Sequence, residues 1–536
     1  MDTATNLRFR RSEAQLHALA GVEREIRTVD PSSQRKYLRD FSEAFRSYES
    51  VISPEELKTL IGSADIVLVG DYHALPACQR FAATFLEERA QPADRPVVLG
   101  VETIFSRDQP ILDEWWRREI DEAELRRRIR FDFDWGYEWA PFYELLVTAR
   151  EHAEAIYGLD CMPREDLRKL GARDRHAVHK IEEIQQRHPD AVIMVLFGES
   201  HLAPGHLPRL LRERMPEPEI LTVLQNVDAL YWRAAGEQHE QVQAVRVAED
   251  TVCVFNSTPL EKYENYRLYL SRWRRSEEEG PDLTPTIYNL IHSLLRFLGL
   301  NLYASHNGTQ PKFLVDLLPE VFSNLSESQL RRLLERETVC EEEQKRLLET
   351  IDKRGSIYLP RANAFYVREF QMGFAAEEAA RFLHNACRGL PSRASEDSPQ
   401  PADRFYIRTL EHAFGYFGSR ALYPARDGID LSMQACEEWM ESASHACQNR
   451  VRTGHGTEFV ETARKLGYAM GSDLYGKYLD GSIARSGLRH LFLAYLEEPG
   501  LARKICSELL GSRSLGRKGP YPDHSLRARA VRSRLA

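Results

Sequence analysis

The chain has 536 residues, a length that favours two or three domains over one hydrophobic core. Hydrophobic residues make up 43% and charged residues 29%, a composition typical of a globular protein, which excludes disordered and fibrous classes. The net charge of −9 argues against general nucleic-acid binding, and we expect no specific binding of nucleic acid.

Cysteine usage and hydropathy indicate the compartment. Eight cysteines are scattered without a C-x-x-C pair, as is common in a reducing environment. The first 25 residues lack the apolar core of a signal peptide, and no stretch approaches the ~20 apolar residues that a membrane span needs. We therefore expect a cytoplasmic protein without a membrane span.

In chain order, residues 1–50 are predicted to form a helical extension, broken near Asp30-Pro31. A new helix begins at Ser53-Pro54, a favourable pair for an N-cap and first turn. From 51 to 280, short β-branched runs alternate with helix-period stretches, which predicts a mostly parallel central sheet flanked by helices. The strand candidates are 66–69, 97–101, 155–159, 191–197 and 220–224, with a shorter sixth at 252–255.

After residue 280 the strand signal vanishes and only helix periodicity remains, so residues 281–511 are predicted to be an all-α domain. The boundary is placed in the charged, Gly/Pro-terminated stretch 276–281. Residues 512–536 are basic and poor in bulky apolar side chains, and we expect a disordered tail. The predicted fold class is α/β followed by an all-α C-terminal domain.

Polar side chains follow four of the predicted strands. The first strand runs into Gly70-Asp71-Tyr72-His73, the second ends at Glu102, and the third ends at Asp160. The fourth runs into Gly198-Glu199-Ser200-His201. Because the carboxyl ends of parallel strands open on one edge, where ligands bind, we expect two imidazoles and up to four carboxylates in one small volume.

Carboxylates at that density repel one another unless a cation lies among them. A metal ion relieves the repulsion and supplies a Lewis acid or an activated water. We therefore predict that His73, Glu102 and His201 bind one divalent transition metal. Histidine and carboxylate ligands suit zinc, iron, manganese or cobalt better than calcium, and the spacing does not choose among these four.

The remaining acids of the same edge are candidates for catalysis. We predict Asp71 or Glu199 as the general base toward a metal-bound water. Asp160 and Tyr72 are secondary candidates for the site. The aromatic stretch 135–139 either forms a wall of the pocket or is a tightly packed turn, and the sequence leaves both alternatives open.

Five stretches in this order carry a family resemblance: Gly70-Asp71-Tyr72-His73, Val98-Leu99-Gly100-Val101-Glu102, Asp134-Trp135-Gly136-Tyr137-Glu138-Trp139, Gly158-Leu159-Asp160-Cys161-Met162-Pro163-Arg164 and Gly198-Glu199-Ser200-His201-Leu202. Together they resemble the ChaN-type haem-binding uptake domain, which is grouped with Tiki-type metalloproteases and erythromycin-esterase-like hydrolases. The resemblance covers about residues 50–275. It implies a metal site made of the two G-x-x-H histidines and a glutamate, and haem as a second possible cofactor.

Three functions stay open at this point. The first is a metal-dependent hydrolase acting on a small-molecule or peptide substrate. The second is a haem- or iron-binding protein without catalysis. The third is a scaffold whose helical domain docks a partner protein.

Overall fold

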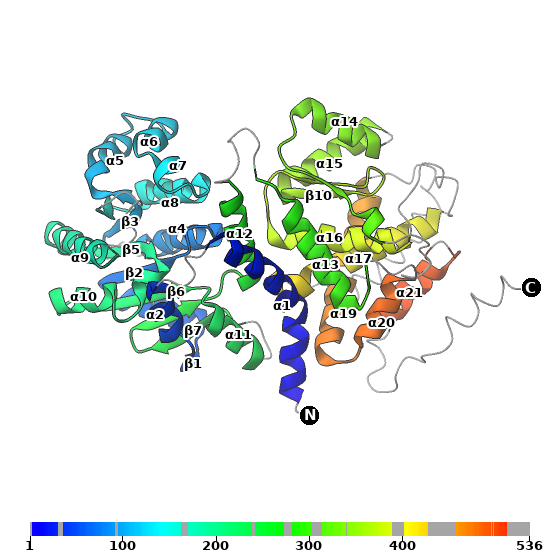
Figure 1. Cartoon of the computed structure of the whole chain (residues 1–536), viewed down its shortest axis with the longest axis horizontal. Helices are drawn as coiled ribbons and strands as arrows, with labels where there is room; N and C mark the ends of the chain where they lie inside the picture. Colours follow the sequence, from blue (N-terminus) through cyan, green and yellow to red (C-terminus); the bar gives the residue numbers. More distant parts are fainter. Residues whose placement is uncertain are drawn as a thin grey trace, which may run out of the picture.

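The computed structural model describes residues 3–30, 36–91, 95–161, 170–237, 242–272, 281–302, 314–338, 340–388, 401–426, 457–494, 496 and 498–511. Figure 1 shows two halves, an α/β half in blue to green and a mostly helical half in green to red. The fold class predicted from the sequence is confirmed. Residues 276–280 of the expected boundary stretch and the basic tail 512–536 lie outside the described residues.

The α/β half is built on one eight-stranded sheet. Its order is β1-β7-β8-β6-β2-β5-β3-β4, and the six strands from β8 to β4 run parallel. All six predicted strands are present. The strands are β1 (Ser50–Val51), β2 (Ile66–Asp71), β3 (Val97–Phe105), β4 (Ala155–Asp160), β5 (Val192–Gly198), β6 (Ile220–Gln225), β7 (Ala244–Ala248) and β8 (Thr251–Val254).

Two edge strands were not predicted. β7 pairs antiparallel with β8, and the two-residue β1 pairs antiparallel with β7. Both are short and partly solvent-facing, so neither carries the continuous apolar run of a strand buried on both faces. The sheet is therefore larger than the five or six strands expected.

Strand residues alternate between two apolar layers. Val67 and Val69 of β2 face the layer that contains α4 and α8, whereas Ile66 and Leu68 face the layer that contains α9 and α10. Helices on both faces are what a parallel sheet requires. The helices of this half are α2 (Lys36–Ala44), α3 (Pro54–Ser63), α4 (Pro76–Ala90), α5 (Gln109–Trp116), α6 (Glu122–Arg128), α7 (Phe131–Asp134), α8 (Trp139–His152), α9 (Leu170–Arg187), α10 (Leu207–Arg214), α11 (Asp228–Glu237) and α12 (Pro259–Arg272).

The other half is mostly helical. Its helices are α13 (Thr284–Leu298), α14 (Glu327–Glu337), α15 (Glu341–Arg354), α16 (Met372–Arg388), α17 (Pro401–Leu422), α19 (Thr457–Asp480), α20 (Arg485–Phe492) and α21 (Leu501–Gly511). The expectation that strands stop at residue 280 was incomplete. β9 (Glu320–Phe322), β10 (Ser356–Leu359) and β11 (Ala364–Val367) form a three-stranded sheet, too short for a periodic signal.

Helix α1 (Thr3–Val29) joins the two halves. It contacts α11 and α12 of the α/β half and α13, α17 and α19 of the helical half, and Figure 1 shows it between them. Ala14 and Ala18 belong to the core of the helical half. Leu19, Val22 and Ile26 form a small cluster with aromatic residues of α11 and α12. The N-terminal extension is therefore a shared packing element.

Three further features of the sequence can be followed in the described residues. The six cysteines that lie in them are free thiols. No helix there is long and apolar enough to cross a membrane. Ser53 caps α3 as predicted, because its side chain accepts a hydrogen bond from the backbone N–H of Glu56.

Candidate functional site

The predicted site residues come from adjacent strands. β5 lies between β2 and β3, and the pairing aligns Asp71 with Gly198 and Val101 with Leu196. The loop after β2, Glu102 in β3 and the short helix η4 (Glu199–Leu202) after β5 therefore meet at one edge of the sheet. This is the edge at which ligands bind in parallel α/β folds. Glu102 does not end its strand as predicted: β3 continues to Phe105, although its pairing with β5 stops at Val101.

The structure brings His73, Glu102 and His201 together. His73 Nε2 lies 3.5 Å from one carboxylate oxygen of Glu102, and His201 Nε2 lies 3.9 Å from the other. Gly198 borders the same space: a Cβ atom there would lie 2.9 Å from Glu102 Oε2 and 3.3 Å from His73 Nε2. Because a Cβ atom would crowd the Glu102 carboxylate, a glycine at this position lets the three side chains approach the backbone of β5.

Each imidazole is held from behind by a carboxylate. His73 Nδ1 lies 2.7 Å from Asp71 Oδ2, and His201 Nδ1 lies 2.5 Å from Asp174 Oδ1. A carboxylate at Nδ1 favours the tautomer with the proton on that nitrogen, which directs the Nε2 lone pair away from it. Both Nε2 atoms are therefore oriented toward Glu102.

Asp174 was missed by the sequence analysis, as was its neighbour Arg173. Arg173 bonds to Glu102 and makes two hydrogen bonds to Asp160, at 3.0 and 2.7 Å. A signal was available: Val178 and Ile181 mark the buried face of α9, and continuing that face by one turn reaches Arg173 and Asp174.

Arg173 changes the electrostatic argument for a metal. The density of acids predicted a neutralising metal ion, but the buried guanidinium of Arg173 already lies among them. Within the described residues, no group of three or more His, Cys, Asp or Glu side chains is arranged as a metal site. A metal at this position would therefore bind beside Arg173.

Glu199 lies in a second ion pair of the same region. Lys262 of α12 donates to both its carboxylate oxygens, at 3.0 and 3.1 Å, and both side chains are buried. The Lys262 ammonium also lies 4.5 Å from the centroid of the Tyr72 ring. The structure thus places Glu199 and Tyr72 with Lys262, which the sequence analysis did not single out.

His73 is the cluster residue most accessible to solvent, with 13% of its side chain exposed against 4% or less for Asp71, Glu102 and His201. Trp135 and Tyr137 border its ring, at centroid distances of 5.5 and 5.2 Å. Both aromatic side chains are buried. Both alternatives for the stretch 135–139 therefore hold: its aromatic side chains are tightly packed, and two of them border the His73 ring.

The charges of this cluster shift its protonation. Burial disfavours the cationic form of His73, but Asp71 and Glu102 outweigh it and raise the pKa of His73 to about 9. Burial likewise opposes ionisation of Glu102, but Arg173 and His73 hold its pKa below the ordinary value. Without a further ligand, His73 is a cation and Glu102 an anion at neutral pH.

Comparison with known proteins supports the resemblance. Residues 59–200 match the family model described as "Haem-binding uptake, Tiki superfamily, ChaN". Within the α/β half, residues 59–200 are therefore similar to ChaN-type proteins. The match lies inside the range of 50–275 expected from the motifs, and it includes Asp71, His73, Glu102 and Glu199 but ends one residue before His201.

A structural comparison gives a weak match to the protein of "Cofacial heme binding to ChaN of Campylobacter jejuni". That protein is 14% identical, and the alignment covers 33% of this chain and 86% of that chain with a TM-score of 0.25. No residue role is transferred from it. No curated protein matched the chain.

Proposed function

We propose that the ChaN-like half is a metal-dependent hydrolase whose centre is the His73–Glu102–His201 cluster. One observation carries the proposal: two imidazoles are each held at Nδ1 by a carboxylate and both turn Nε2 toward one glutamate. Metal-binding histidines in proteins are oriented in this way. Packing alone does not require such an arrangement.

The donor types suit a divalent metal, although these side chains are not arranged as a metal site in the described residues. Glu102 and both imidazoles lie next to the backbone of Gly198, and His73, His201 and Glu102 would hold the ion. When bound, such an ion supplies a Lewis acid and lowers the pKa of a coordinated water. Zinc, iron, manganese and cobalt remain the candidates, because the ligands are imidazole and carboxylate.

The other residues of the cluster have separable roles in this proposal. Asp71 and Asp174 orient the imidazoles, and Arg173 fixes Glu102. Glu199 is the candidate base, because burial raises the pKa of its carboxyl group despite Lys262 and thereby makes the anion more basic. Asp71 is the second candidate for the base; it is bound to His73 and Gln79, as Glu199 is bound to Lys262.

Elemental analysis tests the proposal first. The wild-type protein is expected to retain about one equivalent of zinc, iron, manganese or cobalt after loading and desalting, and His73→Ala and Gly198→Ala to lose it. His179→Ala is the matched control, since that imidazole is 61% exposed on α9. A wild-type protein that retains no metal under any of the four loadings would contradict the assignment.

Hydrolysis is tested separately with ester, amide and lactone substrates. Metal-loaded wild type should hydrolyse at least one class, and Glu199→Gln should lower kcat about 100-fold while metal content is kept. Turnover that is equal in wild type and in both the His73 and Glu199 variants would exclude this centre.

A second candidate, haem binding without catalysis, is favoured by the description of the matching family model. The aromatic rings around His73 could flank a tetrapyrrole, and Tyr72 follows directly on β2. Titration with haemin distinguishes the candidates. A Soret shift at micromolar haem that is lost in His73→Ala or Tyr72→Phe supports haem, and an unshifted band excludes it.

A further inference from the structure

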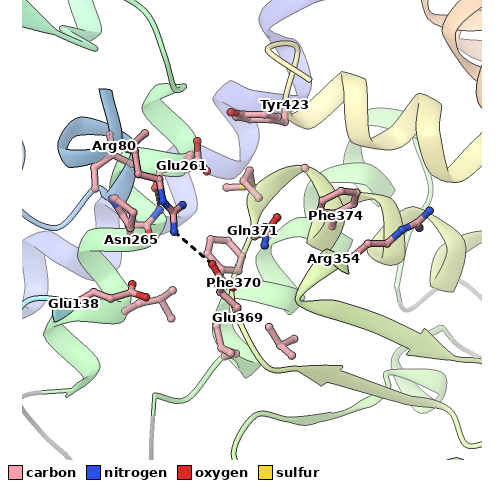
Figure 2. A pocket seen from close by; sticks show the side chains of 18 of the residues that line it. Arg80, Glu138, Glu261, Asn265, Arg354, Glu369, Phe370, Gln371, Phe374 and Tyr423 are labelled. Carbon is pink, nitrogen blue, oxygen red and sulfur yellow. Dashed lines mark hydrogen bonds and ion pairs between the residues drawn. The ribbon is translucent and has the colours of Figure 1, made fainter. Parts of the chain in front are cut away.

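A large cavity lies between the two halves. Its volume is about 1360 Å³. Figure 2 shows Arg80, Glu138, Glu261 and Asn265 of the α/β half on one side, and residues of the helical half, among them Glu369 and Phe374, on the other. His73, Glu102 and His201 do not line it; Tyr137 lies between, because its ring borders both His73 and the cavity.

The wall formed by the helical half carries excess positive charge. Arg354 and Arg426 both pair with one buried carboxylate, that of Glu377, at 3.4 and 2.6 Å. Tyr468 also donates to Glu377 and lines the cavity. Two guanidiniums that share one carboxylate leave one positive charge at a largely buried wall, where an anion is attracted more strongly than in open water.

A further arginine faces the cavity from the opposite side. Arg80 of α4 pairs with Glu369 across the two halves at 3.6 Å, as the dashed line in Figure 2 shows. Both side chains are 48% exposed, so this ion pair is weak and a ligand carboxylate or phosphate can compete for Arg80.

Aromatic side chains accompany these arginines. Eight of the 35 lining residues are aromatic, about twice the 10% share in the whole chain. The Phe374 ring lies 5.5 Å from the Arg354 guanidinium and 5.1 Å from that of Arg426. On the α/β side, Tyr137 and Tyr269 are stacked at 4.3 Å. Such surfaces favour planar π-systems in their ligands.

We propose that this cavity binds an organic anion with a planar aromatic body. Arg80 on one wall and the Arg354–Arg426 pair on the other make the cavity attractive to an anionic group, and the aromatic walls pack against the ring. The site belongs to neither half alone, so the helical half has a role in ligand recognition. The proposal does not depend on the metal-dependent hydrolase assigned to the His73 cluster.

Calorimetry on the full chain tests the proposal with four probes. 2-Naphthoate and 2-naphthyl phosphate present the same ring with different anions, 2-naphthalenemethanol is the neutral analogue, and inorganic phosphate has no ring. Both aromatic anions should bind, and the neutral analogue and inorganic phosphate should each bind at least about tenfold more weakly. The relative affinities of the two aromatic anions identify the natural anionic group.

Variants locate the binding. Arg354→Gln and Arg80→Gln should each weaken 2-naphthoate binding about tenfold. Arg80→Gln removes a half-exposed side chain, so it tests the site even if Arg354→Gln does not fold. Arg331→Gln, a 66% exposed arginine outside the cavity, is the matched control and should leave binding unchanged.

Three results would overturn the proposal: no binding of either aromatic anion at about 5 mM, equal binding of the neutral analogue, or binding unaffected by Arg80→Gln. Binding abolished by His73→Ala but not by the arginine variants would place the ligand in the His73 cluster and also overturn it. Failure of the metal analysis leaves all these outcomes unchanged, so the two proposals fail independently.

Discussion

The two halves of the molecule both bury acidic side chains against arginines. They differ in the charges around a buried histidine: carboxylates surround His73 and His201, whereas an arginine lies against His384. In the α/β half, His73 and His201 each contact two carboxylates. In the helical half, burial and Arg388 lower the pKa of His384 to about 3. Arg388 donates to His384 Nε2 at 3.2 Å, which fits a neutral ring. Buried histidine alone therefore says little about a site, whereas the carboxylates around it are informative.

Replacing the central glutamate of each half should have the largest effect. Glu102→Gln removes the carboxylate that pairs with Arg173 and lies next to both imidazoles. Glu377→Gln removes the carboxylate that pairs with Arg354 and Arg426. Each should lower the free energy of unfolding by about 3–5 kcal/mol, measured by urea denaturation. Only Glu102→Gln should also abolish metal retention. Glu327→Gln is the control, because that side chain is 90% exposed. If Glu377→Gln also lost metal, metal retention would not depend on the Glu102 cluster in particular.

Asp174→Asn should have the next largest effect. The amide cannot accept the His201 Nδ1–H as strongly, so the orientation of Nε2 is loosened. We expect metal affinity to fall about 10–100-fold, measured by competition with a chelating dye. An unchanged affinity would mean that His201 is not a ligand.

The pH dependence of stability should distinguish the helical half. Because the pKa of His384 is lowered from 6.5 to about 3, the folded state binds fewer protons than the unfolded state between these values. Stability therefore falls as pH drops below 6.5, by about 2 kcal/mol at pH 5. His384→Gln should remove this part of the pH dependence of the free energy of unfolding, measured by urea denaturation at several pH values. The control His179→Gln changes an exposed histidine and should keep the wild-type pH dependence of stability. If His384→Gln also kept it, the His384 ring would not be neutral in the folded protein.

The smallest effect is expected at the contact between the halves. Arg80→Gln removes the exposed ion pairs with Glu369 and Glu144. The free energy of unfolding should change by less than about 1 kcal/mol, although binding of aromatic anions changes. A larger loss of stability would show that Arg80 holds the halves together.

The sequence predicted the part of the site that depends on strand order. Asp71, His73 and His201 end or follow a strand with a strong apolar signal, and Glu102 lies within one, just past its pairing with the neighbouring strand. Parallel strands bring such residues to one edge. Their side chains meet as expected, whereas their roles as ligands and base stay predictions.

Arg173, Asp174 and Lys262 were missed for a common reason. They come from helices, and a charged residue on a helix resembles a solvated one unless the buried face is followed into the first turn. The small sheet β9–β11 was missed because strands of three or four residues show no period. The cavity depends on the packing of the two halves, which no local pattern reports.

Helix α1 has a consequence for how the molecule responds to damage. Its alanines are part of the core of one half, and Leu19, Val22 and Ile26 pack against α11 and α12 of the other. Proteolysis near Asp30 that released this helix would uncover apolar surface on both halves at once. Ligand recognition between the halves and the packing of each would then be lost together, through a segment that contributes no residue to the lining of the cavity.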